Sequence, residues 1–161
     1  MDFQPKAHDL DLVDVESALL RAAVGDYTAE AAILLLANFG HWLPQLQAAD
    51  LITVEQDPTG GDRWAQIQWE DLQPALADGR IFGSSGELRV LRAAASLVDG
   101  QPADLGDIAS GLDRRSLMLL LAAIAHAGGS HEHREETTDA GSGITFLGDK
   151  VPPLMAWPPR A

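Results

Sequence analysis

The fold is decided by residues 51–69, LITVEQDPTGGDRWAQIQW. Ile52 and Val54 alternate with polar residues, and the alternation resumes after the turn through Ala65 and Ile67. A period of two is typical of a half-buried strand, and a Pro/Gly-rich turn between two such runs favours a β-hairpin. Helical periodicity lies on both sides of this segment, so the sequence predicts a mainly helical protein that contains one hairpin.

Three helices are predicted before the hairpin, over Asp14–Val24, Ala29–Phe39 and about Pro44–Ala49. The second is apolar most of the way round, which is typical of a central, buried helix. Pro44 suits the first turn of the third, because proline lacks a donor that is unpaired there anyway. Residues 1–12 are polar and aperiodic and are predicted to form a flexible arm.

A capping box gives the clearest local signal after the hairpin and a short helix at about Asp71–Ala77. In Ser84-Ser85-Gly86-Glu87, the serine hydroxyl and the glutamate carboxylate can satisfy each other's backbone donors, which predicts the start of a helix that ends near Asp99. A helical turn at Asp104–Ser110 follows, and Asp113 can cap a long helix over Arg114–Ala127. We expect that helix to bury Leu117, Leu120, Leu121 and Ile124.

These patterns predict an α+β, mainly α fold, in which a three-helix plus β-hairpin (winged-helix-like) unit packs on a C-terminal helical pair. Residues 13–128 are predicted to form a single compact domain, with helices and hairpin over 13–78 and the helical pair over 84–128. Residues 129–161 are expected to be a polar loop, a short strand at Ile144–Leu147 and a proline-rich tail.

The order of helices and hairpin in residues 14–69 resembles a winged-helix module. The stretch 46–63, LQAADLITVEQDPTGGDR, is similar to the segment that joins recognition helix and wing in bacterial winged-helix regulators. The resemblance implies a recognition helix near His41–Asp50 and a wing near Asp57–Arg63. DNA readers depend on Lys and Arg that contact phosphates, and the implied recognition helix has neither. We therefore expect a protein-binding version of this fold.

Residues 84–128 carry a second resemblance, through the capping box and the segments 91–97 (LRAAASL), 105–107 (LGD) and 111–113 (GLD). The segment resembles small uncharacterised proteins from actinobacteria. The resemblance rests on capping and core positions and implies no activity.

Charge and composition limit the functional classes. The net charge is −13, of which −10 falls in residues 1–71. A field of this sign repels phosphate backbones and attracts basic partners, so nucleic-acid binding through bulk charge is not expected. The chain has no cysteine, its start lacks the layout of a secretory signal, and its longest apolar runs are about half of a membrane span. These features favour the cytoplasm.

Histidines gather near the end of the long helix, at His126, His131 and His133, with glutamates nearby. Imidazole and carboxylate groups suit zinc or nickel, so this cluster could serve a small metal-dependent hydrolase. The spacing matches no defined site, and a solvated loop is the favoured interpretation. No nucleophile elbow or phosphate-binding loop is present, and no cofactor is predicted.

The preferred hypothesis is an acidic, non-enzymatic protein-interaction module that docks a basic partner or associates with itself. The acidic candidates are Asp50, Glu55, Asp57 and Asp62. In the tail, Leu154, Met155 and Trp157 lie between prolines, as in a ligand for a groove. The alternative is a tail that packs back on its own domain. A winged-helix transcription regulator and the metal-dependent hydrolase are the other functions considered.

Overall fold

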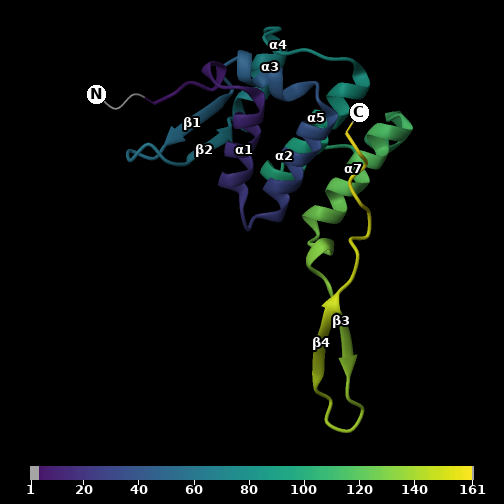
Figure 1. Ribbon diagram of the computed structural model, residues 1–161. Coiled ribbons are helices and arrows are strands. Elements are labelled where there is room, and N and C mark those ends of the chain that lie inside the picture. The colour runs from purple at the N-terminus through teal and green to yellow at the C-terminus, as the bar shows by residue number, and fades with distance from the viewer. Residues whose placement is uncertain (1–3, 161) are drawn as a thin grey trace.

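The computed structural model describes residues 4–160. Within them the protein is α+β and mainly helical, with seven α-helices and two two-stranded antiparallel hairpins (Figure 1). The helices are α1 (Leu12–Ala23), α2 (Tyr27–Phe39), α3 (Trp42–Ala48), α4 (Leu72–Ala77), α5 (Ser85–Asp99), α6 (Leu105–Gly111) and α7 (Arg114–Ala127). The strands are β1 (Ile52–Gln56), β2 (Arg63–Ile67), β3 (Arg134–Thr138) and β4 (Thr145–Lys150). Short 3-10 turns lie at η1 (Ala7–Asp9), η2 (Trp69–Asp71) and η3 (Ser130–Glu132).

Helix α2 lies at the centre of the fold, in contact with α1, α3, α5 and α7. Apolar residues lie on most sides of α2, which explains why the helix is buried among its neighbours. The predicted central helix is confirmed. Trp42, at the start of α3, is fully buried, and its indole Nε1 donates to the Glu87 carbonyl of α5 at 2.8 Å. The core therefore joins the N-terminal helices to the C-terminal ones.

The first hairpin is confirmed. Ile52 lies opposite Ile67 and Val54 opposite Ala65, and these four side chains form one buried face. Strand β2 packs against α1. The alternation in the sequence therefore marks the side of the hairpin that α1 covers.

Several helices begin after a residue whose short polar side chain caps the helix N-terminus. Ser84 Oγ accepts from the Glu87 N–H and the Glu87 carboxylate accepts from the Ser84 N–H, which confirms the capping box. Asp113 caps α7 by accepting from the Ser116 N–H at 2.7 Å. At α2 the cap is Asp26, and Thr28 donates its hydroxyl to that carboxylate.

The predicted buried face of α7 is wrong in part. Leu119, Leu120 and Ala123 are buried, whereas Leu121 is 47% exposed and Ile124 44% exposed. This helix is apolar nearly all round, so its pattern does not select a face. The face that packs carries Ala122 and Ala123, whose small side chains allow α2 to approach closely.

Residues 4–10 are held against the domain, where a flexible arm is predicted. Ala7 is buried, and Gln47 of α3 donates its amide N–H groups to the Ala7 and Leu10 carbonyls. Residues 1–3 of the predicted arm lie outside the described residues.

The second hairpin was not predicted, because residues 131–143 were expected to form a polar loop. Strand β3 lies within that range and pairs antiparallel with β4, which begins one residue after the start of the predicted strand at Ile144–Leu147 and continues to Lys150. Every residue of both strands is exposed. The hairpin projects away from the helices (Figure 1). Without a covered face, the strands carry no alternation that could reveal them.

The proline-rich tail runs back along α7 (Figure 1). Arg115 donates to the Pro159 carbonyl, and Arg160 pairs with Glu16 of α1 while donating to Asn38 of α2. The interpretation of the tail as a segment that packs on its own domain is therefore the one that the structure supports. Within residues 4–160, no helix has both the length and the apolar character needed to cross a bilayer.

Candidate functional site

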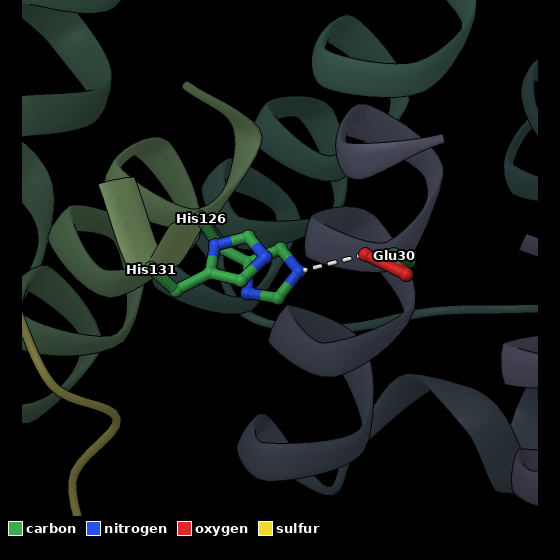
Figure 2. Close-up of side chains that lie close together, drawn as sticks. All are labelled: Glu30, His126 and His131. Carbon is green, nitrogen blue, oxygen red and sulfur yellow. Dashed lines mark hydrogen bonds and ion pairs between the residues drawn. The ribbon is translucent and has the colours of Figure 1, made fainter. Parts of the chain in front are cut away.

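Three potential metal ligands meet where α2, α7 and η3 come together. Glu30 lies in the first turn of α2, His126 in the last turn of α7 and His131 in η3. One ligand atom from each lies within 4.8 Å of the others. Figure 2 shows the two imidazole rings face to face, with His126 directed at the Glu30 carboxylate.

The contacts within this cluster are close. His126 Nε2 lies 3.1 Å from Glu30 Oε1, and both side chains are at least four-fifths buried. The two imidazoles stack with their centroids 3.9 Å apart and their planes 13° apart. The two rings are therefore in van der Waals contact across the junction of α7 and η3.

A glycine turn brings His131 back onto His126. Gly129 has a φ of +75°, and a Cβ there would lie 3.2 Å from the Tyr27 ring. Any other residue would strain the backbone and press on Tyr27, which packs edge-on against both imidazoles. The Gly128-Gly129 pair, which the sequence marks as a helix stop, therefore also positions the second histidine.

The tail covers the far side of the histidine pair. Met155 and Trp157 are partly buried and line a cavity of about 140 Å³ together with His126, His131 and Ala122. Leu154 is exposed, and its backbone N–H donates to Ser130 Oγ. Two of the three tail candidates therefore face the histidines, and the third points to solvent.

His133 lies outside the cluster, contrary to the predicted set of His126, His131 and His133. It is exposed and precedes β3. Its neighbour Glu132 pairs with Lys150 at 2.6 Å, and the hydrogen bond from Lys150 lowers the pKa of the Glu132 carboxyl. The potential ligand that was not predicted from the sequence is Glu30, 96 positions before His126. A lone acid in the apolar segment 29–39 was the one available signal.

The acidic candidates are spread over the β1–β2 end of the molecule and do not converge. Asp50 pairs with His8 at 2.8 Å, and Asp62 lies 4.0 Å from Arg21. The backbone and hydroxyl hydrogen bonds from Thr59 lower the pKa of Asp57, which is thus engaged in its own turn. Glu55 is exposed on β1.

The second hairpin presents a different kind of surface, which we call the hairpin surface. It consists of the outer strand edges of β3 and β4 and the side chains of Ile144, Phe146 and Leu147, which are between 55% and 67% exposed. Each strand has a single hydrogen-bonded neighbour, so each has one edge of unpaired backbone groups. Such an edge is a template for pairing with another chain.

Comparisons with protein-family models, curated proteins and solved structures find no match to this chain. The winged-helix and actinobacterial resemblances therefore remain predictions, and the site has to be interpreted from its own geometry.

Proposed function

We propose that this chain is a protein-interaction module that associates with a second copy of itself through the hairpin surface. The observation that carries the proposal is a two-stranded hairpin whose 11 strand residues are all exposed. An isolated hairpin is at best marginally stable in water, and a third strand or a packed face is what usually stabilises one. Phe146 and Leu147 are exposed apolar side chains, so their burial against a second chain would contribute most of the stabilisation.

The charge distribution favours a second copy as the partner. Residues 1–71 carry −10, whereas residues 72–161 carry 11 acidic and eight basic side chains, for −3. Two copies that meet through their hairpins keep their strongly acidic halves apart, so like-charge repulsion is smallest in this arrangement. Residues 72–161 also expose Leu121 and Ile124 on α7, which adds apolar surface to this part of the chain.

Strand β4 is the better edge for this pairing. An antiparallel pair about a two-fold axis at Leu147 sets the two Leu147 side chains opposite each other, Phe146 opposite Gly148 and Asp149 opposite Thr145. No like charges meet directly in this register. A two-fold axis at Glu136 of β3 would instead oppose two carboxylates, which is destabilising.

Sedimentation velocity over a range of concentrations tests the proposal on the full chain. We expect a dimer for the native sequence and at least a tenfold higher dissociation constant for Leu147→Lys, which would oppose two ammonium groups. Val24→Lys is the matched control, because Val24 is an apolar residue after α1 that is at least as exposed as Leu147. A monomer at all concentrations, or a dimer that Leu147→Lys leaves intact, would refute the proposal.

A cysteine adds a geometric test, since the chain has none of its own. Under mild oxidation, Leu147→Cys should form a disulfide-linked dimer and Val24→Cys should stay monomeric, because only the first brings two thiols together across the axis. Equal cross-linking of the two variants would indicate random collision and would contradict the β4 interface.

A basic partner for the acidic half remains a second proposal, supported by the −10 of residues 1–71. Because Asp50, Asp57 and Asp62 already have partners within the chain, Glu55 is the candidate with most freedom to contact another protein. Such a complex should weaken as salt rises and should weaken further with Glu55→Lys in a pull-down.

DNA binding by a winged-helix-like unit has weaker support than protein interaction. Helix α3 lies where a recognition helix would be, but it has seven residues and its larger apolar side chains, Trp42, Leu43 and Leu46, are buried. It offers no Lys or Arg to a phosphate. Retardation of genomic DNA by the protein in a gel shift at low salt would support DNA binding instead.

A further inference from the structure

We infer that Glu30, His126 and His131 form a binding site for a divalent transition-metal ion of the zinc, cobalt or nickel type. Two imidazoles and one carboxylate are donors that these ions accept, and a fourth position stays free for water or a small ligand. The site lies on α2, α7 and η3, apart from the hairpin surface, and does not depend on the proposed self-association.

Charge balance supports a cation at this point. Glu30 is largely buried, and within residues 4–160 its one ion-pair partner is His126. A largely buried carboxylate is stabilised by a nearby cation. A divalent ion between the three side chains would contact both rings and the carboxylate at once.

The three donor atoms must move closer together to bind a metal ion. Zinc holds nitrogen and oxygen donors at about 2.0–2.2 Å, so the donors must approach closer than the 4.8 Å that spans the cluster, and one ring must tilt out of the parallel stack. His131 borders the cavity between α7 and the tail, into which its ring could tilt. Its Nδ1 is buried and has no hydrogen-bond partner, so rotation of the ring breaks no hydrogen bond at this atom.

The surroundings suit an ion held in a shielded site. Tyr27 packs against both rings, and the tail residues Met155 and Trp157 line the cavity on the other side. These groups limit the access of water, which strengthens electrostatic attraction between the ion and Glu30. An ion here would also fix η3, from which β3 emerges, to α2 in the core.

Titration of untagged full-length protein with Zn²⁺, followed by calorimetry, tests the site. We expect one ion per chain, with affinity at least tenfold lower for Glu30→Gln and for His131→Asn. His133→Asn is the matched control, because His133 is nearby but outside the cluster, and its affinity should stay as in the native protein. Co²⁺ gives a second measurement, since its visible spectrum reports the coordination geometry and should change with the same variants.

Folding is checked separately by circular dichroism, so that a lost site is not confused with a lost fold. Saturating Zn²⁺ should raise the melting temperature of the native protein and of His133→Asn, but not that of Glu30→Gln. The inference is overturned if none of Zn²⁺, Co²⁺ and Ni²⁺ binds at micromolar concentration. It is equally overturned if His133→Asn lowers the affinity as much as His131→Asn does.

Discussion

The two hairpins of this protein have the same topology and opposite surroundings. In β1–β2, one face buries Ile52, Val54, Ala65 and Ile67 against the helices. In β3–β4, no side chain is buried, and the hairpin projects away from the domain (Figure 1). The first is visible in the sequence as alternating residues, and the second is not. Alternation thus indicates a strand face that the chain itself covers, and strands without a covered face need not alternate.

The largest expected difference between the hairpins lies in what their apolar side chains contribute to stability. Ile67→Ala should lower the free energy of unfolding by about 2–5 kcal/mol, because it removes buried methyl groups and leaves a cavity. Leu147→Ala should change it by less than about 0.5 kcal/mol, as for an ordinary surface substitution. Urea denaturation followed by circular dichroism, at the lowest workable protein concentration, measures both. Comparable losses would mean that β4 is packed within a single chain.

The N-terminal cap of α5 is exposed, like the second hairpin, but it could be predicted from the sequence, like the first. Ser84→Ala should cost about 1 kcal/mol, since the Glu87 N–H of α5 loses its acceptor. Ser85→Ala, one residue further along, is the control and should be nearly neutral, because no hydrogen bond of its side chain is present. Equal losses in urea denaturation would show that the capping box does not stabilise α5.

The smallest expected effect is on the pKa of an aspartate in the turn of each hairpin. In both turns, hydrogen bonds lower this pKa. Hydrogen bonds from the Thr59 backbone and hydroxyl lower the pKa of Asp57, and those from the Ser142 hydroxyl and backbone lower the pKa of Asp139. Each turn is therefore stabilised above the ordinary pKa of an aspartate, and this contribution is lost as the pH falls through the lowered value. Carbon-13 NMR of the carboxyl groups should give both midpoints below the ordinary value.

Two variants separate the causes of these pKa shifts. Ser142→Ala should raise the pKa of Asp139 more than Thr59→Ala raises that of Asp57. The hydroxyl bond is the larger cause at Asp139, whereas the backbone bond, which alanine keeps, is the larger at Asp57. The opposite order would show that the two turns hold their aspartates differently.

Much of the fold could be predicted because its signals are local. The capping box at Ser84, the cap at Asp113 and the alternation in β1–β2 each depend on residues within a few positions of one another. The buried face of α7 could be predicted only in part, since the exposed Leu121 and Ile124 are as apolar as the residues that pack. Which side is covered depends on α2, and that contact joins distant parts of the chain.

The candidate metal site was predictable only in part for the same reason. His126 and His131 lie five positions apart, so their proximity could be suspected from the sequence. Glu30 belongs to a helix near the other end of the chain, and nothing in the spacing of residues connects it to the histidines. His133 was included because it is close in sequence, although the strand that begins after it leads away from the site.

The central position of α2 has a consequence for how the chain folds. Its partner α7 begins more than 70 residues after α2 ends, so the part of the α2 surface that α7 covers stays exposed until much of the chain has formed. Contacts of such long sequence separation slow folding, and a folding intermediate without α7 would expose apolar surface of α2. Fragments that stop before residue 114 should therefore aggregate, and the two halves of this small domain should fold together or not at all.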